Sequence, residues 1–188
     1  MSAFENITNK IAEQNARLEE MRQAHMKELQ GDFNNIIKLF FEECPKVQAV
    51  VWSQYTPYFN DGDECVFSVN DPCFITKNFD REELLNPYEY EDDDEYGSLS
   101  IGNWDQLIEN SKNAMNRHDA TQWAKEYYPK HIAKLEQMQE DFPGYDVKIT
   151  AFTKLLTDNE DMLQAVYGDH AAVYLTPTEV IVEEYDHD

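Results

Sequence analysis

Residues 172–182, AVYLTPTEVIV, decide the fold class of this chain. Two apolar, β-branched runs stand on either side of Thr176-Pro177-Thr178, a group that favours a turn. The stretch therefore predicts a β-hairpin near the C-terminus. Residues 47–55, VQAVVWSQY, have the same character, and CVFSV at 65–69 follows the Asp-Gly turn signal in residues 60–63. These two runs predict a second hairpin.

The segments between the hairpins predict helices. Asp80-Arg81-Glu82-Glu83 starts a short helix that Asn86-Pro87 stops, and apolar residues then recur at helical spacing from about residue 103 to 140 and from 146 to 167. One of these helices starts before Trp123, Ala124 and Tyr127, and Pro129 predicts a kink or restart in it. Two hairpins separated by helices indicate an α+β domain, an antiparallel sheet of about four strands covered by helices.

The first 45 residues predict one long amphipathic, coiled-coil-like helix, capped at Ser2 and ended by Pro45. Gly31-Asp32 is a candidate interruption of it. A second apolar register, with a one-residue slip, follows the first, as in a stutter. The first register comprises Phe4, Ile7, Ile11, Leu18 and Met21, and the second comprises Met26, Leu29, Phe33, Ile36 and Phe40.

A helix of about 40 residues extends about 60 Å, which exceeds the width of a small domain. We therefore expect the first register to mediate homo-oligomerisation or partner binding. The alternative is a helix that folds back on its own sheet. On this basis the chain divides into a long helix at 1–45 and an acidic α+β domain at 46–188.

Charge is the dominant feature of the composition. The net charge is −23, and it is uneven: residues 1–60 carry −2, residues 61–105 carry −12 and residues 106–188 carry −9. A protein with this excess of negative charge repels phosphate backbones and anionic membranes, so we expect no direct nucleic-acid or membrane binding. Three roles for the acidic residues remain: they solubilise the protein, form a docking face for a basic partner, or bind a cation.

The expected location is the cytoplasm. The three cysteines, an odd number without a CxxC pair, argue against a disulfide framework. The N-terminus lacks the basic and apolar regions of a secretion signal, and no apolar run reaches the length of a membrane span.

Catalytic and metal-binding motifs are absent from this sequence or incomplete in it. The sequence contains no P-loop, GxGxxG, HExxH or GxSxG motif, so no catalytic residue and no cofactor is assigned. EF-hand spacing around Gly62 fails, because Pro57 and Phe59 would occupy ligand positions. An irregular cation site, or a cation-dependent enzyme, built from the carboxylates of 60–71 (Asp61, Asp63, Glu64 and Asp71) remains an alternative. Cys65 and Cys73 lack the second close-spaced pair of a zinc site, and Cys65 is expected on a strand face with Phe67 and Val69.

Tyrosines interleaved with acids suggest a contact surface. Tyrosine offers rigid amphipathic contact area, and carboxylates can imitate phosphates on a partner that normally holds DNA. Residues 88–96, YEYEDDDEY, are expected to form an exposed acidic loop of the domain. The alternative to a contact surface is that Tyr55 and Tyr58 pack on the sheet and that this loop is simply disordered. The candidate partner-binding residues are Tyr55, Tyr58, Asp61, Asp63, Tyr90, Glu91, Asp92, Asp93, Asp94 and Glu95.

The blocks YTPYFNDGDECVF (55–67), YGDHAAVYLT (167–176) and the C-terminal VEEYDHD resemble a poorly characterised family of small acidic proteins of bacteriophages and bacteria. The resemblance implies a cytoplasmic accessory protein, phage-encoded and acting on a host system, and brings no site residues. It does not cover the long N-terminal helix.

Together these features favour a non-enzymatic interaction protein that docks on a basic host protein, as an inhibitor or DNA-mimic-like decoy. The alternatives are a cation-binding protein or cation-dependent enzyme, and a structural oligomer or virion component built on the N-terminal helix.

Overall fold

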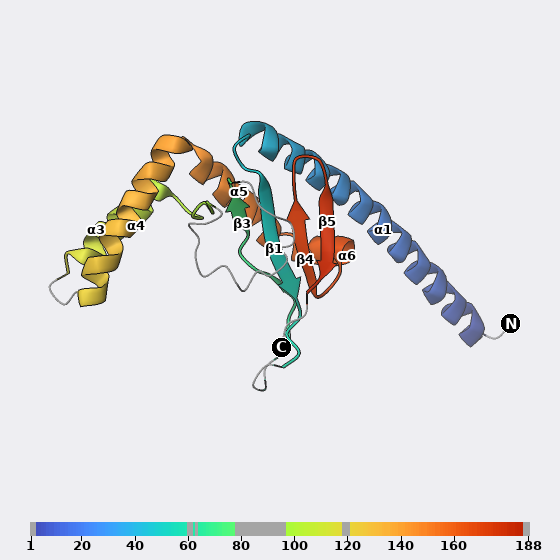
Figure 1. Cartoon of the computed structure of the whole chain (residues 1–188). Coiled ribbons are helices and arrows are strands. Elements are labelled where there is room, and N and C mark those ends of the chain that lie inside the picture. Colours follow the sequence, from blue (N-terminus) through green and yellow to red (C-terminus); the bar gives the residue numbers. More distant parts are fainter. Residues whose placement is uncertain (1–2, 60–61, 63, 78–96, 118–120, 186–188) are drawn as a thin grey trace. The chain divides into compact units, whose positions relative to one another are not determined.

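A computed structural model describes residues 3–59, 62, 64–77, 97–117 and 121–185 (Figure 1). The chain has an α+β fold, as predicted, and divides into two compact units, Met1–Lys38 and Leu39–Asp188. The helix expected after residue 80 and the acidic loop 88–96 lie outside the described residues. None of the described helices is both long enough and apolar enough to cross a membrane.

Helix α1 (Ala3–Glu43) is continuous, so the predicted interruption at Gly31-Asp32 does not occur. It ends two residues before Pro45, in keeping with the clash that proline imposes on a preceding α-helical residue. The large apolar side chains from Ile7 to Met21 are exposed, whereas Phe33 and Phe40 are buried. Ile36, also in the second register, lies at the edge of the apolar stripe and is 37% exposed, whereas its neighbour Ile37 is buried.

The sheet is antiparallel throughout. Strands β1 (Ala49–Tyr55) and β4 (Ala171–Leu175) form its centre, and β5 (Val180–Glu184) flanks β4. On the other side of β1 lie β2 (Ser68–Val69) and β3 (Cys73–Ile75), so that β1 lies between β3 and β4 in Figure 1. The predicted C-terminal hairpin is confirmed, with Leu175 opposite Val180.

The first hairpin differs from the prediction. Tyr55 pairs with Ser68, so residues 56–67 connect the two strands, and Cys65 and Phe67 lie outside the strand in which they were expected. Residues 60, 61 and 63 of the Asp-Gly turn signal lie outside the described part. Gln54 pairs with Val69 and Val51 with Cys73, which leaves three residues, 70–72, opposite two. This is a β-bulge, and Pro72, which has no N–H to donate, lies within it. The bulge divides one edge strand into β2 and β3.

The two faces of β1 contribute to different parts of the core. On one face, the ring centroid of Phe74 of β3 lies 5.7 Å from that of Phe40 and 6.1 Å from that of Phe152, and the last two are 4.6 Å apart. Phe152 belongs to α5 (Tyr145–Thr157), which is followed by α6 (Glu160–Tyr167). The alternate residues of β1 join a second buried cluster, formed by Ala49, Val51, Ile75, Ala172, Tyr174 and Tyr185.

Helices α3 (Trp104–Met115) and α4 (Gln122–Asp141) form a helical hairpin. Their N-caps are the side chains of Asn103 and Thr121. Pro129 lies inside α4 without ending it. The helix predicted to start before Trp123, Ala124 and Tyr127 is α4, whose buried residues are Ala124, Ile132, Leu135 and Met138, whereas Trp123 and Tyr127 are exposed.

Candidate functional site

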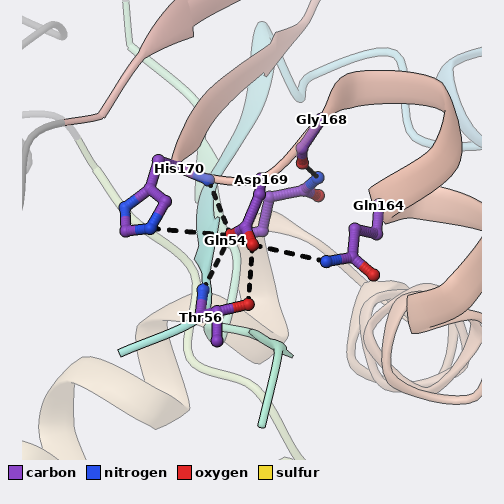
Figure 2. A network of polar contacts seen from close by, with 6 residues as sticks. All are labelled: Gln54, Thr56, Gln164, Gly168, Asp169 and His170. Carbon is purple, nitrogen blue, oxygen red and sulfur yellow. Dashed lines mark hydrogen bonds and ion pairs between the residues drawn. The ribbon is translucent and has the colours of Figure 1, made fainter. Parts of the chain in front are cut away.

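The segment that follows β1 and the segment that precedes β4 are far apart in the sequence but meet at the end of the sheet where β1 ends and β4 begins. Thr56 donates from its backbone nitrogen to Asp169 Oδ1 and from its hydroxyl to Oδ2, both at 2.7 Å (Figure 2). Asp169 also accepts from the backbone nitrogen of His170 at 2.9 Å and from Gln164 Nε2 at 3.4 Å. One carboxylate therefore fixes the segment that leaves β1 to the segment that enters β4.

The network favours the ionised form of this carboxylate. Burial alone would raise the pKa of Asp169. The hydrogen bonds from Thr56 and from the backbone of His170, together with the charge of a protonated His170, outweigh that effect. The pKa of Asp169 consequently lies below its ordinary value, and the group is an anion at neutral pH.

His170 lies beside this carboxylate in an unusual conformation. Its φ of 53° is in the left-handed region, which is rare for a residue other than glycine. The imidazole stacks on Tyr58, with ring centroids 4.5 Å apart, and Tyr185 donates its backbone N–H to the carbonyl of His170. Within the described part of the chain, the buried Nδ1 has no hydrogen-bond partner.

Gln54 supports the network from within the core. Its side chain is fully buried, and its Nε2 donates to the carbonyls of Leu163 and Gly168 at 3.1 and 2.6 Å. Its Oε1 accepts from Trp52 Nε1 at 3.1 Å. All of the hydrogen-bonding groups of this buried amide face partners on β1 or at the end of α6, so Gln54 sets the position of the chain just before Asp169.

The geometry suits structural support better than proton transfer. His170 Nε2 lies 3.9 Å from Asp169 Oδ1, beyond hydrogen-bond length, and the carboxylate is already engaged by Thr56. The buried Nδ1 of His170 has no hydrogen-bond partner within the described part of the chain, so no hydroxyl or thiol is activated at that nitrogen. The network instead holds the start of the 56–67 connection, where Tyr58 is 71% exposed and Phe59 is 79% exposed. We call these two residues the aromatic tip.

The predicted contact residues have different placements. Tyr55 is half-buried against Tyr185, with ring centroids 5.5 Å apart, whereas Tyr58 is largely exposed. On α1, Ile7, Ile11, Leu18 and Met21 are 52–62% exposed. The remaining predicted residues, Asp61, Asp63, Tyr90, Glu91, Asp92, Asp93, Asp94, Glu95 and the side chain of Phe4, lie outside the described part.

Sequence reasoning missed Phe59, Thr56, Asp169 and His170. Phe59 was considered only as an unsuitable calcium ligand. The Thr56–Asp169 contact joins residues 113 positions apart, and no local pattern indicates it.

The cation alternative gains no support from the described residues. Among them, no group of three or more His, Cys, Asp or Glu side chains could hold a metal ion. Glu64 and Asp71, the two described members of the candidate set, are both exposed.

A scan of protein-family models finds no match for this chain, and searches of curated proteins and of solved structures find none either.

Proposed function

We propose that this chain is a non-enzymatic interaction protein that docks through its aromatic tip on a basic surface of another protein. The observation that carries the proposal is the tip itself: Tyr58 and Phe59 are adjacent, more than 70% exposed, and supported at their base by the Asp169 network. Large apolar rings on a supported loop lose little conformational freedom on binding, which makes them suitable anchors.

The surrounding sequence specifies the kind of partner. The tip is followed by Asp61, Asp63 and Glu64, within the segment of residues 61–105 that carries −12. Carboxylates beside an apolar anchor complement a basic surface, including one that normally holds nucleic-acid phosphates. The resemblance to small acidic phage and bacterial proteins fits a host protein as the target and a decoy or inhibitor as the role.

The test compares wild-type protein with the double variant Tyr58→Ala/Phe59→Ala in capture from bacterial lysate at low and high salt. Basic proteins should be retained by the wild type at low salt, released at high salt, and lost with the variant. Where the captured protein binds DNA, the wild type should also compete with duplex DNA for it. Retention of the same proteins by the variant would contradict docking through the tip. The control is Val147→Ala, which alters an exposed apolar residue of α5.

A second observation favours self-association through α1. Ile7, Ile11, Leu18 and Met21 form a heptad-spaced seam, and each is more than half exposed. We propose that this seam packs against the same seam of a second copy. In a parallel pair Arg17 faces Arg22 of the second copy, and each copy carries −23. Association should therefore become stronger as salt screens the repulsion.

A further inference from the structure

Helix α4 carries a continuous stack of aromatic rings outside the site described above. Trp123 and Tyr127 are parallel, with centroids 4.8 Å apart and planes at 11°, and Tyr127 stacks on His131 at 5.5 Å and 17°. Tyr128 meets the edges of Trp123 and Tyr127. Trp123, Tyr127 and His131 occupy positions i, i+4 and i+8 of the helix, so the helix itself sets the spacing of their rings.

The hairpin core does not require this stack. Trp123 is 63% exposed and Tyr127 is 43% exposed, whereas α4 is buried through smaller or aliphatic residues. The inner end of the stack is anchored on α3, where His131 Nδ1 lies 3.0 Å from Ser111 Oγ. An exposed tryptophan stacked on a tyrosine is a large apolar area left in water, which is typical of an interaction surface.

The stack lies in the most basic part of the chain. Residues 111–134 contain five of the fifteen bases and only two acids, a local charge of +3 in a protein of −23. Trp123, Tyr127, Lys130 and Lys134 have spacings of four, three and four residues, so they share one face of α4. Of the two acids in this window, Glu126 accepts a hydrogen bond from Gln122 at 2.6 Å and Asp119 lies outside the described residues. Among the bases, Lys112 pairs at 3.5 Å with Glu136, just beyond the window, whereas Lys130 belongs to the face that carries the stack.

The groups that this face offers are mainly hydrogen-bond donors. The indole N–H of Trp123 and the ammonium of Lys130 can only donate, and neither has a partner among the described residues. Both faces of the Tyr127 ring are covered by its neighbours, which leaves ring edges, partially positive, toward the solvent. Such a surface complements carboxylate oxygens.

We infer that this face of α4, formed by Trp123, Tyr127, Lys130 and Lys134, binds a short acidic segment of a partner protein. A nucleic-acid strand fits less well, because successive bases need open ring faces on which to stack, and an extended polyanion would also meet the acidic remainder of the chain. A short segment can stay within a screening length of the local positive charge. The inference is independent of the aromatic tip, which belongs to a different element.

The test is fluorescence anisotropy of the full-length protein with a labelled short peptide of alternating glutamate and tyrosine. A peptide with glutamine in place of glutamate and a single-stranded oligonucleotide serve as alternative probes. We expect the acidic peptide to bind, and Trp123→Ala and Lys130→Glu each to weaken binding at least about tenfold. Both residues are exposed, so circular dichroism should show an unchanged fold.

Two variants control for apolar area and for charge elsewhere on the same unit: Val147→Ala and Lys154→Glu, both on α5. They should bind the acidic peptide as the wild type does. The inference would be overturned if the acidic peptide did not bind, or if the glutamine peptide bound equally well. It would also be overturned if the oligonucleotide bound more tightly, or if the control variants lost as much affinity for the acidic peptide as Trp123→Ala and Lys130→Glu. Loss of tip-dependent capture with intact peptide binding would count against the proposed function alone.

Discussion

At the residue scale, Gln54 is the side chain on which the Asp169 network most depends. Replacing it by Ala leaves Trp52 Nε1 and the carbonyls of Leu163 and Gly168 without their partner in a buried site. Unsatisfied buried groups cost about 1–3 kcal/mol each, partly relieved by relaxation and water. We expect Gln54→Ala to lower the free energy of unfolding by about 2–4 kcal/mol in urea denaturation. Gln137→Ala, at an exposed position of α4, should change it by less than about 0.5 kcal/mol.

Asp169 gives a pH-dependent contribution whose sign follows from its pKa. The folded pKa lies below the unfolded value, so the stabilisation is fully present above the unfolded pKa and is lost as pH falls through the folded pKa. Because the carboxylate is 37% exposed, water screens it, and we expect less than about 1 kcal/mol. Urea denaturation of wild type and Asp169→Asn should show a difference at about pH 6 that shrinks toward about pH 3. A difference that grows on acidification would contradict the assignment.

The three free cysteines should react in an order set by burial. Cys44 is fully buried, and burial raises the pKa of its thiol to about 11, while Cys73 is exposed. Since the thiolate is the reactive form, iodoacetamide should modify Cys73 first and Cys44 only after unfolding. Mass spectrometry of digested samples measures the order. Early labelling of native Cys44 would show that the end of α1 opens readily.

At the element scale, the two halves of α1 should respond differently to substitution. Leu18→Ser removes an exposed apolar residue of the proposed seam, so it should abolish self-association and change stability little. Phe40→Ala empties a buried position against Phe74 and Phe152, and should cost about 3–5 kcal/mol of unfolding free energy. Light scattering measures the first effect and urea denaturation the second. An unchanged mass for Leu18→Ser relative to an oligomeric wild type would contradict the seam.

At the scale of the whole molecule, a net charge of −23 makes salt act in opposite directions on different processes. Screening reduces repulsion among the acids, so the midpoint of thermal unfolding should rise with added salt, and self-association should strengthen. Capture of a basic partner through the aromatic tip should weaken instead. Calorimetry, light scattering and pull-down over one salt series measure whether salt raises or lowers thermal stability, self-association and partner capture. Docking that strengthens with salt would contradict charge complementarity.

The sequence by itself determined the fold class, most of the elements and the electrostatic character of this protein. Helical and strand periodicities are local, so α1, the strand at 49–55 and the C-terminal hairpin were all predictable from neighbouring residues. Charge and its uneven distribution are properties of composition and need no structure.

Only the tertiary structure decided which residues meet and which faces are covered. The contact of Thr56 with Asp169 and the bulge at 70–72 both depend on partners that are distant in the sequence. Trp123 and Tyr127 fit an apolar pattern on α4 but are exposed, because the α3–α4 hairpin buries a different face. Periodicity specifies that a helix or strand has an apolar side, and long-range packing selects which part of that side becomes core and which remains available for binding.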